Sequence, residues 1–149
     1  FQLDFFFQGQ QGADMLNINM IESMYPNNAR RNRITEQALD RWTPQNPTAK
    51  WPSGVQPHAY GGGKVNTMAL QDASYVRLRN LSVGYNLPVE KVKFIQTARI
   101  YVVGQNLATF TNYIGFDPEA NAFGRSNVRV DYNGYPLART WMLGVNVGF

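Results

Sequence analysis

Alternation between apolar and polar side chains is the most regular pattern along this chain, and it is clearest over residues 139–149. Mostly small or polar residues, with Met142 as the exception, fill every second position there, and the positions between them hold Trp141, Leu143, Val145, Val147 and Phe149. A period of two predicts a β-strand with one apolar face. Its length also suits a tilted strand that crosses a bilayer, which needs about 9–11 residues. An edge strand of a soluble sandwich is the alternative interpretation.

Three further segments have strand character, at residues 1–10, 74–87 and 98–113. In the first, an acid and several glutamines alternate with an apolar row made of Phe1, Leu3, Phe5 and Phe7. Such a strand suits a wall between lipid and a water-filled lumen, although a half-buried strand of a soluble protein has the same pattern. The segment 98–113 is rich in β-branched and aromatic residues. Its apolar side chains fall on both parities, which leaves its register open.

Two arginines interrupt the alternation within residues 74–87. Arg77 and Arg79 fall on the same parity as an apolar row that consists of Leu81, Val83, Tyr85 and Leu87. An arginine at the midplane of a bilayer costs about 2–4 kcal/mol. We therefore expect either that both arginines lie above the hydrocarbon band, or that a β-bulge shifts the register between them and the apolar row.

The connections between these strands are alternately long and short, at residues 11–73, 88–97 and 114–138. Asn32 can cap a short helix over Arg33–Trp42, with one side formed by Ile34, Ala38, Leu39 and Trp42. Prolines after this helix disfavour regular structure. Long extracellular loops and short periplasmic turns are typical of outer-membrane barrels. Because about eight strands are needed to close a barrel, we expect a chain that begins within an apparent strand to be part of a larger wall.

The amino-acid composition argues against several classes of protein. The chain of 149 residues has no cysteine, which excludes a disulfide framework and cysteine-based metal sites. Charged residues make up 16% of the chain, below the roughly 25% of typical soluble domains. The net charge of +4 is modest, and no nucleic-acid partner is expected, since such binding needs basic residues gathered with stacking aromatics. No apolar run is long enough for a membrane-spanning helix.

The sequence offers little for catalysis, and no enzyme, cofactor or metal site is expected. His58, the single histidine, lies between a proline and an alanine and lacks the partners of a zinc site or triad. Asp117 and Glu119 could suggest a glycosidase pair, but their spacing around a proline favours a structural loop. The glycines at 61–63 lack the lysine and helix of a phosphate loop. Four aromatic residues could stack on sugar rings or pack their own loop: Trp42, Trp51, Tyr60 and Tyr113.

Several ordered motifs resemble one family. YVRLRNLSVGYNLP (Tyr75–Pro88), IYVVGQNLATFTNYIGFDPE (Ile100–Glu119) and NGYPLARTWMLGVNVGF (Asn133–Phe149) resemble the C-terminal part of the SusC/RagA family of TonB-dependent outer-membrane transporters. RWTPQNPTAKWP (Arg41–Pro52) is similar to that family's helix and proline-rich outer loop, and FFFQGQQGADM to the preceding strand. The resemblance covers nearly the whole chain.

The resemblance implies a transmembrane antiparallel β-barrel of about 22 strands with an N-terminal plug, of which this chain supplies the four C-terminal strands. The connections 11–73 and 114–138 would be extracellular, and 88–97 would be periplasmic. Such transporters import oligosaccharides or peptides with a SusD-like surface lipoprotein, and TonB energises them through the plug, which is not in this chain. The basic residues Arg30, Arg31, Arg33 and Arg41 could contact lipopolysaccharide or the lipoprotein, or could form a solvated face.

The resemblance also extends to the signal that the outer-membrane assembly machinery recognises. Gly144, Val145, Val147 and Phe149 match its glycine, hydrophobic residues and terminal aromatic. A strand with a free edge would dock on the machinery before the barrel closes. Two other functions stay open on the residues alone: a soluble all-β carbohydrate-binding or hydrolytic domain, and a passive porin.

Overall fold

The computed structural model describes residues 1–24, 35–53, 67–92, 94–122, 124 and 129–149. These residues form two compact units, each of which is assembled from separate parts of the chain. The sheet unit comprises 1–13, 73–114 and 136–149, and the loop unit comprises 14–72 and 115–135.

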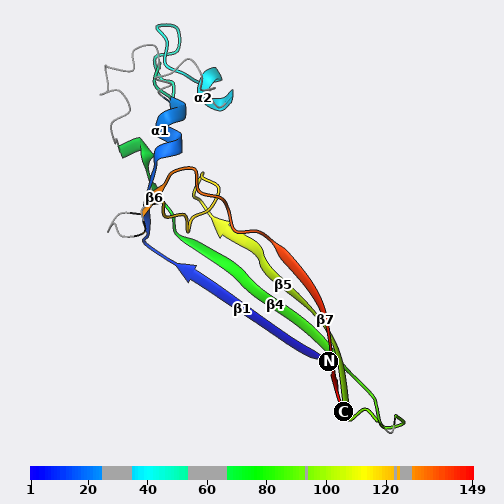
Figure 1. The fold of residues 1–149 in the computed structure, drawn as a ribbon. Helices are drawn as coiled ribbons and strands as arrows, with labels where there is room; N and C mark the ends of the chain where they lie inside the picture. The colour runs from blue at the N-terminus through cyan, green and yellow to red at the C-terminus, as the bar shows by residue number, and fades with distance from the viewer. Residues whose placement is uncertain (25–34, 54–66, 93, 123, 125–128) are drawn as a thin grey trace. The chain divides into compact units, whose positions relative to one another are not determined.

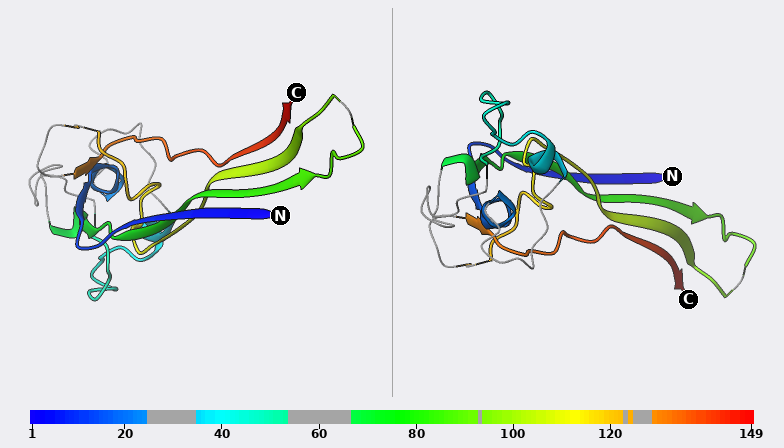
Figure 2. Two further views of the ribbon diagram at one scale, coloured as in Figure 1. Left: turned by 90° about the horizontal axis from the view of Figure 1, so that it is seen from below. Right: turned by 90° about the horizontal axis from the view of Figure 1, so that it is seen from above.

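The sheet unit is one antiparallel sheet of 4 strands in the order β1-β4-β5-β7 (Figure 1). The strands are β1 (Gln2–Gln10), β4 (Tyr75–Leu87), β5 (Thr97–Thr111) and β7 (Thr140–Gly148). They run side by side along a curved path, with the two chain termini at one end of the sheet (Figures 1 and 2). Curvature of this kind follows from the right-handed twist of extended strands of L-residues.

Directly paired residues of antiparallel strands lie on the same face of a sheet, so the observed registers assign every paired side chain. One face, the apolar face, is formed by Leu3, Phe5, Phe7, Gly9, Val76, Leu78, Leu81, Val83, Tyr85, Leu87, Ala98, Ile100, Val102, Gly104, Ala108, Phe110, Trp141, Leu143, Val145 and Val147. The other, the polar face, is formed by Gln2, Asp4, Phe6, Gln8, Gln10, Tyr75, Arg77, Asn80, Ser82, Gly84, Asn86, Thr97, Arg99, Tyr101, Val103, Gln105, Thr109, Thr111, Thr140, Met142, Gly144, Asn146 and Gly148.

A β-bulge at Arg79 keeps both faces uniform. The β1–β4 register shifts between Phe6 and Phe7, and the β4–β5 register shifts between Leu78 and Asn80, so Arg79 lies outside both backbone registers. An extra residue reverses the phase of alternation. Of the two alternatives that the sequence offered, the β-bulge is therefore confirmed, and it places Arg77 on the polar face.

Asn106 of β5 lies at the same level and adopts a left-handed conformation with φ of 53°, which asparagine tolerates better than most residues. Its side-chain amide donates a hydrogen bond to the Ala138 carbonyl at 3.1 Å. The Arg79 guanidinium donates to the Asn106 side-chain oxygen at 3.4 Å and to Gln8 Oε1 at 2.9 Å. The bulge is thus tied to β1 and β5 by side chains.

The loop unit contains a second sheet of 3 strands, in the order β3-β2-β6. These strands are β3 (Leu70–Asp72), β2 (Asp14–Asn17) and β6 (Arg129–Asp131). Strand β2 pairs antiparallel with β3 and parallel with β6. A short 3₁₀ helix, η1 (Thr67–Ala69), precedes β3. The buried core of this unit consists of Leu16, Met20, Ile21, Trp51, Ala69 and Val130.

Helix α1 (Ile18–Met24) follows β2 directly. Asn17 caps it, because its side-chain oxygen accepts a hydrogen bond from the Met20 amide at 2.9 Å. Asn19, in the first turn, donates to the buried Asp131 carboxylate at 3.2 Å and accepts from the Asn133 amide at 2.9 Å. The start of α1 therefore fixes the end of β6.

Helix α2 spans only Thr35–Leu39, whereas the sequence suggested Arg33–Trp42; Arg33 and Ile34 lie outside the described residues. The predicted apolar side is wrong: Gln37 is buried, and Leu39 is 79% exposed. The helix ends early because Trp51 takes the next backbone groups, with the Trp51 amide donating to the Asp40 carbonyl at 3.2 Å. Pro44 further disfavours helical backbone at the residue before it.

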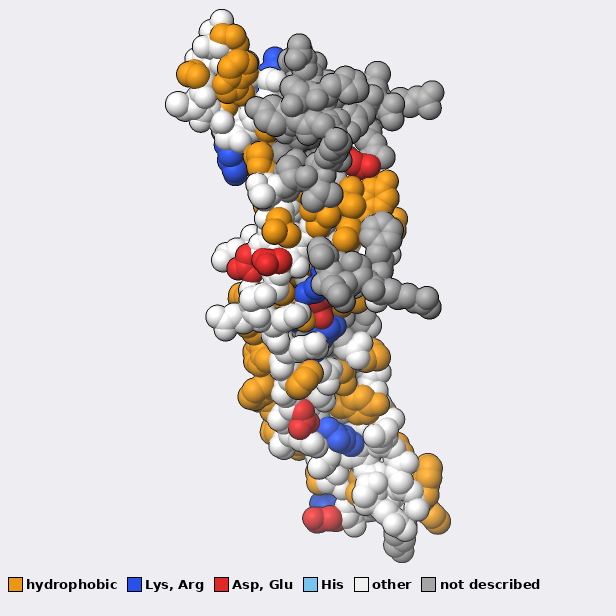
Figure 3. All heavy atoms as spheres, turned by 90° about the vertical axis from the view of Figure 1, so that its left-hand side faces the viewer, with side chains coloured by type: hydrophobic (Ala, Val, Ile, Leu, Met, Phe, Trp, Pro, Cys, Tyr) orange, Lys and Arg blue, Asp and Glu red, His pale blue; other side chains and the backbone are white. Residues whose placement is uncertain are grey.

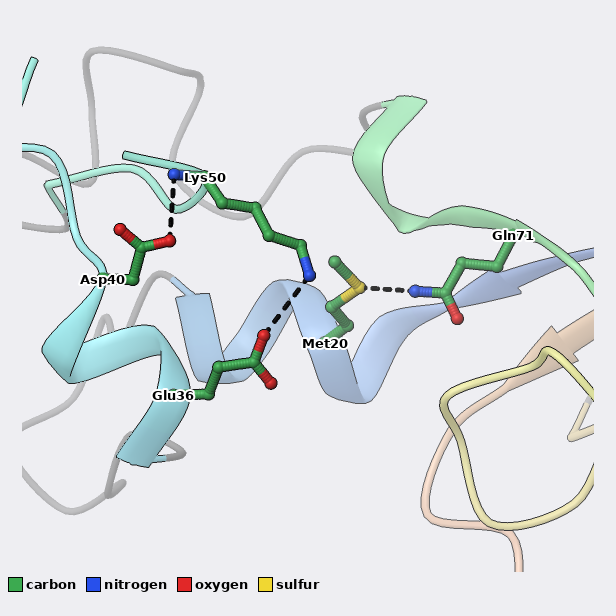
Figure 4. A network of polar contacts seen from close by, with 5 residues as sticks. All are labelled: Met20, Glu36, Asp40, Lys50 and Gln71. Carbon is green, nitrogen blue, oxygen red and sulfur yellow. Dashed lines mark hydrogen bonds and ion pairs between the residues drawn. The ribbon is translucent and has the colours of Figure 1, made fainter. Parts of the chain in front are cut away.

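Polar contacts join α2 to the segment that follows it (Figure 4). The Lys50 ammonium lies 3.3 Å from Glu36, and the Lys50 amide donates to the Asp40 carboxylate at 3.3 Å. In the same view Gln71 donates to the Met20 sulfur at 2.7 Å. The ion pair is largely exposed, so its contribution is small, and packing of Trp51 is the main anchor of this segment.

Both long connections contain more structure than the sequence indicated. Residues 11–73 were expected to hold one short helix, but they contribute β2, α1, α2, η1 and β3. Residues 114–138 contribute β6. These elements are short, and the pairing of β2 with β6 joins residues more than a hundred positions apart, which local patterning does not reveal.

Candidate functional site: the two faces of the sheet

The apolar face is the most distinctive surface of the chain. Its paired positions hold no charged residue, and its side chains are open, with Trp141, Leu143 and Val145 exposed by 65%, 75% and 59%. Figure 3 shows hydrophobic side chains at the surface along the sheet strands, in the lower part of the view. Exposed contiguous apolar surface of this kind marks contact with a membrane or another protein.

The polar face is suited to water. Its side chains are mostly amides, hydroxyls and glycines, with Asp4 as its one acid among the paired positions and Arg77 and Arg99 as bases. Arg77 is 3% exposed, and its guanidinium lies 5.7 Å from the Tyr75 ring centroid. A sheet with one apolar and one polar face can separate hydrocarbon from an aqueous channel.

The residues weighed for catalytic chemistry lie only partly within the described residues. The part of the chain that the structure describes contains no group of three or more histidine, cysteine or acidic residues that could hold a metal, and His58 and Gly61–Gly63 lie outside it. Asp117 is buried, and its carboxylate accepts a hydrogen bond from the Glu119 amide at 2.9 Å. This carboxylate therefore stabilises its own turn, in agreement with the structural interpretation of this pair.

The aromatic candidates differ in exposure. Trp51 is 4% exposed within the core of the loop unit, and Tyr113 is 6% exposed. Trp42 is 46% exposed, so its ring is accessible, and Tyr60 lies outside the described residues. A hollow of about 800 Å³ lies where β1, β4 and β5 end, and none of the three described candidates lines it.

The four residues of the expected assembly signal lie at the edge of the sheet. Val145 and Val147 belong to the apolar face, whereas Gly144 belongs to the polar face, opposite Tyr101. Phe149 follows the end of β7 and is 84% exposed. Strand β7 has a neighbour on one side only, so its other edge is open for pairing. The sequence did not predict the contact between Gly144 and Tyr101, because it did not determine the register of the 98–113 strand.

Among the residues that the structure describes, no helix has the length and apolarity needed to cross a membrane.

Comparison with known proteins finds relatives along the whole chain, although no family model matches it. Two TonB-dependent receptors of Formosa agariphila, P3 and P26, are 37% and 36% identical over 157 residues and cover 100% and 97% of this chain. The TonB-dependent receptor SusC of Bacteroides thetaiotaomicron is 29% identical over 93 residues, or 59% of the chain. The chain spans 15% of the length of P3 and P26 and 8% of SusC.

Solved structures of related proteins match the fold of this chain. The RagAB peptide importer superposes with a TM-score of 0.80 in its closed-closed state and 0.82 in its open-open state. The sequence identity is 30%, and the match covers 99% of this chain and 15% of the importer chain.

The chain is thus a segment of a TonB-dependent receptor, which is the class that its two-faced sheet and its relatives define. Within that class it belongs to the SusC/RagA family, whose members are proteins of the bacterial outer membrane. The family resemblance of the strand motifs is confirmed.

Proposed function

We propose that this chain forms part of the barrel wall of an active nutrient importer in the outer membrane. The observation that carries the proposal is the register of the sheet, which collects apolar residues and glycines on one face. In the proposed arrangement the apolar face meets hydrocarbon and the polar face lines a water-filled lumen. Closure of the barrel, with about 22 strands, requires the rest of the protein.

The direction of the strands follows from the same proposal. The turn between β4 and β5 is short, whereas the connections that form the loop unit are long. Because long loops of such barrels are extracellular, we place the loop unit outside the cell and the turn at 88–96 in the periplasm. Arg41 and Trp42 of the loop unit are exposed, and they are candidates for contact with lipopolysaccharide or substrate.

The partners and the substrate are inferred from the relatives. RagAB is described as a peptide importer, and SusC is a TonB-dependent receptor. We accordingly propose uptake of oligosaccharides or peptides, with a SusD-like surface lipoprotein as the partner and TonB, acting on a plug, as the energy source. The assembly machinery would recognise β7 through Gly144, Val145, Val147 and Phe149. No enzymatic step is part of this function.

The rival functions make different demands on the chain. A soluble all-β domain would have to cover the apolar face, most of whose large side chains are exposed among the described residues. Covering it would need a second layer of structure packed on this sheet. A passive porin would share the two-faced wall but would need no TonB.

Uptake by cells that carry the complete receptor tests the proposal. Labelled maltooligosaccharides and a labelled tryptic peptide mixture are offered to cells with and without the receptor, and with and without TonB. We expect accumulation of one of the two probes, abolished when either the receptor or TonB is absent. Uptake that persists without TonB would establish a porin, and recovery of the receptor in the soluble fraction would exclude a membrane wall.

A further inference from the structure

Three polar-face side chains near the start of β5 lie over glycines of the two neighbouring strands. A Cβ atom added at each glycine would lie closer to the covering side chain than the 3.0 Å that real Cβ atoms keep. We call these three contacts the glycine seats: Tyr101 over Gly144, Arg99 over Gly84, and Thr97 over Gly148. None of the three glycines has a positive φ, so each contact concerns a neighbour on the sheet. The obstruction is an aromatic ring at Gly144, whereas at Gly84 and Gly148 it is the outer part of the Arg99 side chain and the Thr97 hydroxyl, which can move aside more easily.

The seat at Gly144 is the tightest. A Cβ atom there would overlap Cζ and Oη of Tyr101 and would lie 2.6 Å from Cε2. The obstruction is an aromatic ring that is itself held, because the Arg99 guanidinium lies 5.7 Å from the ring centroid. At Gly84 the corresponding distance to Arg99 Nε is 2.7 Å. Arg99 and Tyr101 thus link β4, β5 and β7 across the polar face.

Alternation alone does not determine the register of such a sheet. If β7 slipped by one residue against β5, its apolar side chains would move to the polar face and its polar side chains to the apolar face. In the proposed wall such a slip is unfavourable, because polar side chains would then meet lipid. A slip of two residues keeps every apolar side chain on the apolar face, so hydrophobicity does not oppose it. After such a slip of β7, Tyr101 would face Met142 or Asn146 instead of Gly144. Both side chains occupy the space that the ring needs.

We propose that the Tyr101–Gly144 seat, supported by the other two, fixes the register of β7 against β5 by rejecting two-residue slips. Gly144 is then recognised by a tyrosine of its own chain, and Val145, Val147 and Phe149 are left to the assembly machinery. The inference concerns the sheet and holds whichever substrate the receptor imports. It refines the proposed assembly role of β7 and can fail while that role stands.

Disulfide reporters measure the register directly in the complete receptor. This chain contains no cysteine, and any elsewhere in the receptor are replaced first. Val102 pairs with Leu143 on the apolar face, so Val102→Cys with Leu143→Cys reports the native register. Val102→Cys with Val145→Cys, or with Trp141→Cys, reports a two-residue slip in either direction, because the diagonal separation is too long for a disulfide in the native sheet. All reporters lie on the face opposite the seats.

Gly144→Ala is expected to lower the native cross-link, per receptor synthesised, by about tenfold, which corresponds to an overpacked contact of about 1.4 kcal/mol. Tyr101→Ala combined with Gly144→Ala is expected to restore it, because the ring that meets the new methyl group is gone. Thr140→Ala, on the same face of β7 and opposite Gln105, is the matched control and should leave the cross-link unchanged, because Tyr101 does not face residue 140 in the native register or after a two-residue slip.

Each outcome of the cross-linking experiment either supports or overturns the role of the Tyr101–Gly144 seat in fixing the register. Rescue by Tyr101→Ala supports the seat, including the case in which Gly144→Ala alone yields no assembled receptor. A native cross-link that is unaffected by Gly144→Ala would overturn the proposal. A loss that Tyr101→Ala does not rescue would also overturn it, and would return Gly144 to recognition by the assembly machinery.

Discussion

Leu143→Arg is expected to destabilise the assembled receptor by about 2–4 kcal/mol, the effect of an arginine on the lipid face near the middle of a bilayer. Leu143 lies near the centre of β7 and is 75% exposed on the apolar face. In the proposed wall this exposure is to hydrocarbon, where a guanidinium loses its hydration. Urea unfolding of the receptor in lipid vesicles, followed by loss of heat-modifiable migration on gels, measures the difference.

Met142→Arg is the matched control for this prediction. Met142 is adjacent, also apolar and 43% exposed, but it lies on the polar face. Its arginine would project into water, so the free energy of unfolding should change by no more than about 0.5 kcal/mol. Equal destabilisation by the two substitutions would mean that the two faces have similar surroundings, which is incompatible with a membrane wall.

Trp51→Ala is expected to destabilise the loop unit by about 3–5 kcal/mol, the range for removal of a buried large aromatic side chain. Trp51 packs in the core of that unit and is 4% exposed. Its backbone also pairs with the segment that follows α2, where the Trp42 amide donates to the Trp51 carbonyl at 2.7 Å. Loss of amide hydrogen-exchange protection in β2 and β6 of the complete receptor, with the barrel strands unaffected, is the expected readout.

Trp42→Ala provides the comparison, because Trp42 comes from the same segment and is 46% exposed. Its removal should change the stability of the loop unit by no more than about 0.5 kcal/mol. Any loss of uptake would then report a contact with substrate or the lipoprotein. If Trp51→Ala impaired uptake while leaving hydrogen exchange unchanged, Trp51 would act as a ligand contact and not as a core residue.

The four long strands were predictable because a strand whose two faces differ in polarity alternates from one residue to the next. The strands β1, β4, β5 and β7 begin and end within one residue of the predicted ranges, except that β5 ends two residues before the end of the 98–113 segment. The bulge at Arg79 was foreseen as one of two alternatives, since the sequence shows where the phase of the pattern changes. The register of β5 was not foreseen, because apolar side chains fall on both parities of this segment and Asn106, with its positive φ, interrupts the alternation.

The loop unit was largely missed for a different reason. Its stability comes from contacts between distant segments, such as β2 with β6, and each strand is too short for a periodic signal. Asn17 before an apolar run was a local capping signal for α1 that could have been used. The burial of Gln37 and Trp51 depends on tertiary packing that the pattern around α2 does not encode.

For the candidate site, too, features that depend on local pattern were predictable and features that depend on contacts between strands were not. Membership of the apolar row was visible in the sequence for 1–10, 81–87 and 139–149, because it depends there only on parity, but it was not visible for 98–113. The pairing of Gly144 with Tyr101 was not visible, because it depends on the relative register of two strands. Glycine in a strand is a common sign of close approach, but the approaching residue is known only when the strands are aligned.

A spin-label scan along β7 tests the central claim most directly. Single cysteines at residues 141–147 of the complete receptor carry a nitroxide in lipid vesicles, and its collisions with oxygen and with a water-soluble nickel complex are compared. We predict that oxygen access is highest at Trp141, Leu143 and Val145, with nickel access highest at Met142 and Asn146. Nickel access that is equal along the strand, or that is highest at Trp141, Leu143 and Val145, would contradict a wall with lipid on its apolar face.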